Sequence, residues 1–263
     1  LQPVQGKHTA MDGTELLMPD ELQKTNGNGL PPGLSAAGLP LAKNWLAVIA
    51  FIWIGQAVSM ITSYAAGYAI VWYVTESTGS ALVLAFMNAC VMLPMGLLSP
   101  FGGIVADKHN RKLIMIAADG AVGLISLAAG FLILGGEVSL LLLLIVCIGR
   151  SVGQAFHSPA MMAAMPMLVP DEHLLRINTL DQLLASIASI GAPAFGIFLY
   201  TTLGFSSVMF LDFAGACVAV LGLLLAKVPT VVDAKAVEQH ALANLRDGWR
   251  AVSKTRGLVL LMA

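Results

Sequence analysis

Two ionisable side chains, Asp119 and Arg150, each lie inside a long run of apolar residues. A charge near the middle of a membrane helix costs roughly 2.5–3.5 kcal/mol on insertion scales, so such residues are usually paired and functional. Asp119 comes six residues after its run begins at Leu113, and Arg150 twelve residues after the next run begins at Val138. In antiparallel helices rising ~1.5 Å per residue, these positions have similar depths in the membrane. We therefore predict an Asp119–Arg150 ion pair; the alternative is that Arg150 extends to the interface and Asp119 makes a structural contact.

A polar face follows Arg150 along the same run. Gln154 and His157 come four and seven residues later, which places all three side chains on one face of a helix. Such a face on an apolar helix should point into a helix bundle or toward a water-filled cavity. Asp119, Arg150, Gln154 and His157 are therefore candidates for coupling to protons. For His157 the alternative is a packed or interfacial histidine that carries no proton.

Four further polar residues, Gln56, Ser59, Thr62 and Asn88, lie in the first two apolar runs and are candidates for lining a substrate path. The alternative is that they form hydrogen bonds between packed helices. The sequence contains no HExxH, GxSxG or Walker pattern and no cluster of metal ligands. We therefore predict no catalytic site, no metal site and no enzymatic activity.

The composition is typical of a membrane protein. Hydrophobic residues make up 57% of the 263 residues, charged residues make up only 11%, and the mean hydropathy is +0.83. Soluble domains carry about 25% charged residues. No basic stripe with interleaved aromatic residues appears, so no nucleic-acid partner is expected. The cysteines all lie in apolar runs, where they behave as small buried hydrophobic residues; they are Cys90, Cys147 and Cys217.

Six apolar runs are long enough to cross a bilayer, which takes about 20 residues. They predict an all-α, six-helix transmembrane bundle over residues 45–227. Thirteen of the 14 Lys and Arg residues then fall on one side, which the positive-inside rule identifies as the cytoplasm. The predicted spans are Trp45–Val74, Ala81–Ala106, Leu113–Gly135, Val138–Met165, Asn178–Thr201 and Ser206–Lys227.

The remaining segments are predicted to lie outside this bundle. Residues 1–44 are polar and rich in Gly and Pro, which is typical of a disordered tail, in this case cytoplasmic. Residues 228–256 have apolar residues every three or four positions and predict an amphipathic linker on the inner membrane surface, or else a soluble linker helix. Residues 257–263 are apolar but too few to cross, so we predict a fragment that ends at the truncated start of a seventh span.

A short charged turn separates the second and third predicted spans. Its pattern resembles a loop of the major facilitator superfamily, which reads Gly, three residues, Asp, a basic residue, any residue, Gly and two basic residues. Asn110 stands at the second Gly, and Asn tolerates the left-handed conformation, so a tight left-handed turn remains possible. An ordinary cytoplasmic loop would also collect basic residues, but it leaves the Gly and Asp spacing unexplained. The residues in register are Gly103, Asp107, Lys108, Arg111 and Lys112.

The resemblance implies the N-terminal half of a twelve-helix secondary transporter, plus the start of its seventh helix. It implies alternating access, in which two halves rock about a central site, with Asp107 and Arg111 gating the cytoplasmic face. Residues 78–81 and 158–160 most resemble the drug-efflux branch, which includes macrolide and enterobactin exporters. That branch implies proton-coupled efflux of a drug-like or siderophore-like small molecule.

The resemblance also implies the partners and the location. We expect no cofactor beyond a proton gradient. The expected partners are a small-molecule substrate, the lipid bilayer and the C-terminal half of the same transporter. The expected location is the inner or plasma membrane, with several spans and a cytoplasmic N-terminus. The alternatives are an importer or a lysolipid flippase on the same fold, or an intramembrane enzyme, which would need a nucleophile–base pair or paired carboxylates.

Overall fold

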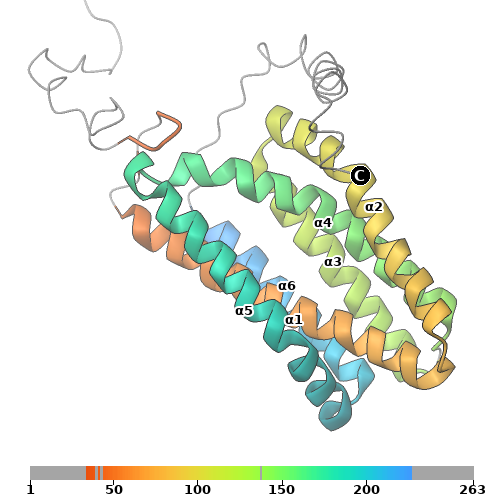
Figure 1. Ribbon diagram of the computed structural model, residues 1–263. Helices are drawn as coiled ribbons and strands as arrows, with labels where there is room; N and C mark the ends of the chain where they lie inside the picture. The colour runs from red at the N-terminus through yellow and green to blue at the C-terminus, as the bar shows by residue number, and fades with distance from the viewer. Residues whose placement is uncertain (1–33, 39–40, 42–43, 137, 227–263) are drawn as a thin grey trace, which may run out of the picture.

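Six long helices make up the part of the chain that the computed structural model describes, residues 34–38, 41, 44–136 and 138–226 (Figure 1). Each helix is long and apolar enough to cross a membrane. The predicted all-α, six-helix bundle is therefore confirmed. The helices are α1 (Trp45–Thr78), α2 (Ala81–Lys108), α3 (Arg111–Leu134), α4 (Leu140–Leu168), α5 (Asp171–Leu203) and α6 (Phe205–Leu225).

The helices form two groups. α1 packs along α5 and α6, while α4 packs along α2 and α3. The groups join mainly where α3 packs against α6, whereas α1 and α5 make only small contacts with α2 and α4. Figure 1 shows α1, α5 and α6 on one side of the bundle and α2, α3 and α4 on the other. This arrangement leaves space between α1 and α5 on one side and α2 and α4 on the other, and the candidate site lies there.

Capping residues end the helices and allow short connections between them. α1 ends at Gly79, whose φ of 58° is left-handed and suits glycine. The next residue, Ser80, begins α2 by accepting a hydrogen bond from the N–H of Val83. Ser139 begins α4 in the same way, accepting from the N–H of Leu142. Consecutive helices are therefore joined by turns of a few residues.

The fifth helix begins earlier than predicted. The sequence predicted a start at Asn178, whereas α5 begins at Asp171. Asp171 and Glu172 occupy its first turn, where negative side chains interact favourably with the positive end of the helix dipole. Hydropathy misses these turns because they are polar. Arg176, which falls between the fourth and fifth predicted spans, is therefore helical.

Residues 34–38 contact the end of α4, although the sequence predicted them as part of a disordered tail. The N–H of Ala36 donates to the carbonyl of Val169 at 2.8 Å, and the N–H of Ala37 donates to the carbonyl of Pro166 at 2.9 Å. Carbonyl groups at the C-terminal end of a helix lack partners within the helix, so this segment satisfies two of them. Residues 1–33 of the predicted tail, the predicted linker and the predicted seventh span lie outside the described residues.

α2 and α4 approach closely because α2 has a glycine at the contact. A Cβ atom built on Gly102 would lie 2.2 Å from the carbonyl oxygen of Ala155, too close for any side chain. Pro159 has no N–H to donate to that oxygen, so the carbonyl of Ala155 lacks its usual partner within α4. Among the described residues, nothing lies within 4 Å of a Cβ built on Gly103, the glycine of the predicted motif. Gly102 therefore sets the distance between these helices, and Gly103 does not.

Candidate functional site

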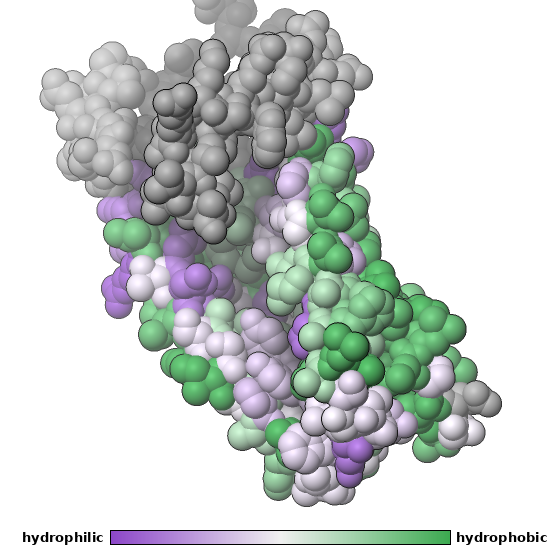
Figure 2. All heavy atoms as spheres, turned by 45° about the vertical axis from the view of Figure 1, so that its right-hand side comes forward, coloured by the Kyte–Doolittle hydropathy of each residue, from purple (hydrophilic) through white to green (hydrophobic). Residues whose placement is uncertain are grey.

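A cavity of 740 Å³ opens between the two groups of helices. Its wall comes from α1, α2, α3, α4 and α5 and is mainly apolar, with a few polar side chains. Figure 2 shows a hollow between the two sides of the molecule, with hydrophilic residues in it and a hydrophobic surface beside it. Pockets for drug-sized ligands typically have about 300–1,000 Å³ and this mixture of groups. The wall includes the methionines and aromatic residues Trp53, Met60, Tyr64, Tyr68, Met87, Met92, Met95, Met161 and Met162.

Most of the residues predicted for proton coupling or for a substrate path lie in the wall of this cavity. Thr62 is the exception, because it faces α6. A Cβ built on Gly215 of α6 would lie 2.1 Å from the Thr62 hydroxyl oxygen, and that hydroxyl donates to the carbonyl of Ser59 at 3.0 Å. Thr62 therefore belongs to the α1–α6 contact. The predicted residues that line the cavity are Gln56, Ser59, Asn88, Asp119, Arg150, Gln154 and His157.

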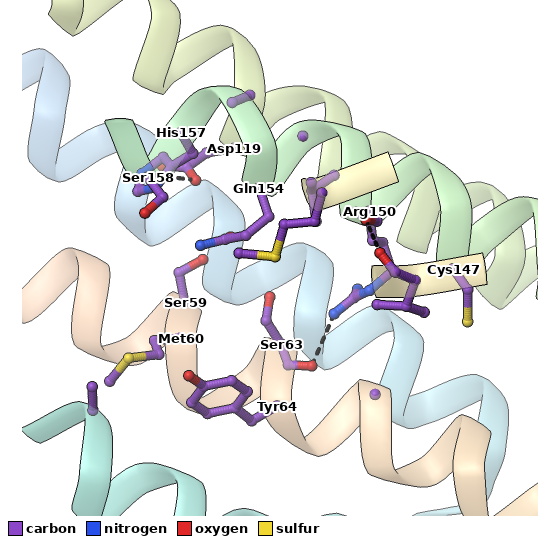
Figure 3. A pocket seen from close by; sticks show the side chains of 18 of the residues that line it. Ser59, Met60, Ser63, Tyr64, Asp119, Cys147, Arg150, Gln154, His157 and Ser158 are labelled. Atoms are coloured by element: carbon purple, nitrogen blue, oxygen red, sulfur yellow. Dashed lines mark hydrogen bonds and ion pairs between the residues drawn. The ribbon is translucent and has the colours of Figure 1, made fainter. Parts of the chain in front are cut away.

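Arg150 joins α4 to three other helices beside the cavity. Its guanidinium forms an ion pair with Asp212 of α6, whose side chain is only 1% exposed. Nη1 also donates to the hydroxyl of Ser126 on α3 at 2.8 Å. Nη2 donates to the backbone carbonyl of Ser63 on α1 at 2.8 Å, as Figure 3 shows. The hydroxyls of Ser63 and Ser126 donate to Asp212 at 2.7 and 2.5 Å. We call these four residues the arginine layer.

The predicted pair between Asp119 and Arg150 is wrong. Arg150 meets Asp212 instead because α6 packs along α3 at this level. On α3 the residue beside Arg150 is Ser126, which lies seven residues, or about 10 Å, from Asp119. The depth estimate failed because the ends of the apolar runs are not the ends of the helices; α4, for example, continues to Leu168. Asp212 carries the same signal as Asp119, a charge within an apolar run, but it was not among the predicted site residues.

Asp119 belongs to a second polar cluster, closer to the end of the bundle that holds the charged α2–α3 turn, which we call the basic end. One carboxylate oxygen accepts a hydrogen bond from the side-chain amide of Gln56 on α1 at 2.9 Å. The other oxygen lies 3.4 Å from Nε2 of His157 on α4, which is ion-pair distance without the alignment of a hydrogen bond. Figure 3 shows Asp119 and His157 side by side. We call Gln56, Asp119 and His157 the histidine layer.

Two basic residues of the charged turn bind the ends of neighbouring helices. Nη1 of Arg111 donates to the carbonyl of Ala163 on α4 at 3.0 Å, and Nη2 lies 3.9 Å from a carboxylate oxygen of Asp107. Nζ of Lys112 donates to the carbonyl of Ala226 at the end of α6 at 2.7 Å. Cations are favourable at helix C-termini, where free carbonyl groups carry partial negative charge. The turn therefore links α2 and α3 to α4 and α6.

Comparison with known proteins places this helix arrangement in a family. The family profile described as Major Facilitator Superfamily matches residues 52–263. The chain belongs to the major facilitator superfamily. Each half of a transporter in this superfamily has six membrane helices, and the described helices correspond to one such half. The resemblance that the sequence of the charged turn indicated is thereby confirmed.

Several superfamily relatives are exporters by name. Macrolide efflux protein A of Streptococcus pyogenes is 34% identical over 223 residues, which cover 83% of this chain and 54% of the relative. Macrolide efflux protein A of Enterococcus faecalis is 32% identical over 188 residues, or 70% of this chain and 57% of the relative. Enterobactin exporter EntS of Escherichia coli O1:K1 / APEC is 28% identical over 151 residues, or 57% of this chain and 35% of the relative. The chain spans about half the length of the macrolide relatives, and no solved structure matches it.

At the superfamily's charged turn, Asn110 begins α3 and does not make a left-handed turn. Its φ of −62° and ψ of 109° are extended, and its side-chain oxygen accepts a hydrogen bond from the N–H of Lys112 at 3.0 Å. The left-handed turn that the sequence left possible at this position therefore does not form. Asn is among the most favourable residues for capping a helix N-terminus, which explains why Asn110 can stand where the superfamily pattern has Gly.

Proposed function

We propose that this chain forms one half of a secondary active transporter that exports a drug-like or siderophore-like small molecule by alternating access. The observation that carries the proposal is the cavity of 740 Å³, which is mainly apolar and has polar groups from several helices. Its volume suits a drug-sized ligand. The relatives' names support this direction and class of substrate, because they specify macrolide efflux and enterobactin export.

The second half of the transporter is the proposed partner that completes the cavity wall. Substrate sites in this kind of transporter lie near the middle of the membrane, at the interface between repeated units. The cavity opens between α1 and α5 on one side and α2 and α4 on the other, which is where a second six-helix half would fit. The other proposed partners are the lipid bilayer and the substrate.

The distribution of basic residues supports a cytoplasmic position for the basic end. Lys108, Arg111 and Lys112 lie at the α2–α3 turn, and Arg176 lies near the start of α5 at the same end. Positive charges accumulate on the cytoplasmic side of membrane proteins. We therefore place the transporter in the inner or plasma membrane with this end in the cytoplasm. Asp107 and Arg111, which lie 3.9 Å apart at this end, are the proposed gating residues.

A proton gradient is the proposed energy source. Protons that move inward down their gradient would drive the substrate outward, so the mechanism needs no cofactor. The candidate groups for this coupling are polar, and all of them line the cavity. They are Asp119, Arg150, Gln154 and His157.

Transport by the complete, two-half transporter tests this proposal. In inside-out vesicles with an acidic lumen, we expect a radiolabelled macrolide antibiotic to accumulate in the lumen against its concentration gradient. A protonophore should abolish the accumulation, because it removes the gradient that drives it. The chain of 263 residues alone should give no flux, because a central site needs walls from both halves.

Other results would change the proposal in defined ways. Accumulation of a catechol siderophore instead of the macrolide would leave export standing and assign the siderophore as the substrate. Transport only toward the cytoplasmic side would identify an importer, and movement of a fluorescent lysolipid would identify a flippase. Flux through the chain of 263 residues alone would contradict the proposal that it is half of a transporter.

A further inference from the structure

The two polar layers beside the cavity differ in whether one of their side chains can gain and lose a proton. The layers are about 10 Å apart along α3 and α4, because their members on each helix are seven residues apart. Both layers join α4 to α1 and α3, but only the arginine layer includes α6. Each layer contains one cationic or potentially cationic side chain and one carboxylate.

The arginine layer is closed to proton exchange. Oδ1 of Asp212 accepts from the hydroxyl of Ser63, and Oδ2 accepts from Ser126 and Arg150. The Asp212 side chain is 1% exposed, so water does not reach these oxygens. A guanidinium group does not lose its proton in proteins. The Arg150–Asp212 pair therefore acts as a fixed connection between α4 and α6.

The histidine layer is built differently. Nε2 of His157 is 3.4 Å from Oδ1 of Asp119 and makes no aligned hydrogen bond, while Gln56 holds the other carboxylate oxygen at 2.9 Å. Both side chains line the cavity and are 13% and 12% exposed, although the Nε2 atom itself is buried. Imidazole is the side chain that ordinarily exchanges its proton between pH 5 and 8. When His157 carries a second proton, its positive charge cancels the negative charge of Asp119. When His157 is neutral, no charge on it balances the Asp119 carboxylate.

Among the described residues of the cavity wall, no other cation is free to balance Asp119 when His157 is neutral. In the described part of the wall, α2 contributes no charged group, and α3 contributes only Asp119 itself. The charge of Arg150 is already matched by Asp212 of α6. The titratable or charged groups of the wall besides the pair are Tyr64 and Tyr68 of α1, Cys147 and Arg150 of α4, and Asp181 of α5.

We propose that the Asp119–His157 pair binds the coupling proton, while the Arg150–Asp212 pair stays ionised throughout the transport cycle. This inference rests on the proposed proton-driven export and selects one site from the candidate groups. On the extracellular side a hydronium ion transfers a proton to the unprotonated ring nitrogen of His157, so that its O–H bond breaks and an N–H bond forms. On the cytoplasmic side the N–H bond breaks and the proton forms an O–H bond with water, which leaves as hydronium. Gln56 is a positioning residue, because it orients the carboxylate that receives the charged imidazole.

The test measures protons that move with substrate in liposomes containing the complete transporter and a trapped pH-sensitive dye. For the unmodified transporter, movement of a macrolide should cause proton movement in the opposite direction. In Asp119→Asn and in His157→Gln, macrolide-dependent proton movement should fall to the level of protein-free liposomes. Macrolide accumulation driven by a pH gradient should be lost in both variants. Exchange of macrolide down its own concentration gradient, which needs no proton, should be reduced less. Asp119→Glu keeps the carboxylate and should retain proton movement.

Control variants separate this inference from the proposed function. Glu76 lies near the end of α1 that is farther from Gln56, and is therefore remote from the Asp119–His157 pair. Glu76→Gln should keep macrolide-dependent proton movement. If the unmodified transporter moves macrolide without protons, proton-driven export itself is wrong. If it moves protons and both Asp119→Asn and His157→Gln still do so, only the assigned site is wrong. If Asp181→Asn abolishes macrolide-dependent proton movement and Asp119→Asn does not, the inference is overturned and Asp181 of α5 becomes the proton-binding residue. Should Asp119→Asn fail to insert, His157→Gln decides.

Discussion

Replacing Asp212 with alanine should lower the free energy of unfolding by about 3–5 kcal/mol, because it leaves the guanidinium of Arg150 buried without its partner. The Asp212 side chain is only 1% exposed, so its contact with the guanidinium lies on the side of Arg150 away from water. Arg150→Ala should cost a similar amount, since it leaves the Asp212 carboxylate unpaired. Reversible unfolding of the chain in mixed detergent micelles measures both losses.

A double-mutant cycle shows whether the two residues interact. The Asp212→Ala, Arg150→Ala double variant should recover part of the stability, with a coupling energy of about 1–3 kcal/mol. The matched control is the cycle between Arg150 and Asp119, which lie in different layers and should be coupled only weakly. Stronger coupling of Arg150 to Asp119 than to Asp212, or additive losses for Arg150 and Asp212, would contradict the arrangement of the arginine layer.

Replacing Gly102 with alanine should lower the free energy of unfolding by about 1–3 kcal/mol, because the added methyl group overpacks the α2–α4 contact. The new Cβ would lie 2.2 Å from the carbonyl oxygen of Ala155, and a helix backbone cannot move aside as a side chain can. The helices would have to separate. The same unfolding measurement in detergent gives the size of the loss.

The adjacent glycine provides a matched control for that measurement. A Cβ on Gly103 meets nothing within 4 Å among the described residues. Gly103→Ala should therefore leave stability unchanged or raise it by roughly 0.5–1 kcal/mol, since alanine is the better helix former. Equal losses for Gly102→Ala and Gly103→Ala would mean that the close approach of α2 and α4 does not limit side-chain size.

The number of helices and their approximate positions could be predicted from the sequence because a bilayer imposes strict requirements. Each span must be long, apolar and hydrogen-bonded within itself, so the apolar runs alone indicate the spans. The cavity-facing side of α4 was also predictable, because Arg150, Gln154 and His157 repeat at helical spacing in an otherwise apolar run. Polar turns outside the apolar core, such as the first turns of α5 from Asp171, leave no such signal.

The ion-pair partners could not be predicted, because they depend on which helices are neighbours. Counting residues gives a depth for Asp119 and Arg150 but does not reveal that α6 packs beside α3 and brings Asp212 to Arg150. The pairing of Asp119 with His157 has the same origin, since it depends on the relative positions of α3 and α4 along their axes. The role of Asn110 was missed for a local reason, because asparagine favours both left-handed turns and helix N-caps.

Alternating access through the cavity is the central proposal, and the accessibility of one cavity residue tests it most directly. Tyr64 lies in the cavity wall and is 36% exposed. In the complete transporter without its native cysteines, Tyr64→Cys can be treated with a membrane-impermeant maleimide in right-side-out and inside-out vesicles. Glu76→Cys should react from the extracellular side only, and Leu124→Cys, an exposed apolar position outside the cavity, should react from neither side. We predict that Tyr64→Cys reacts from both sides and that a macrolide shifts the ratio of the two rates. Reaction from a single side under every condition would contradict alternating access through this cavity.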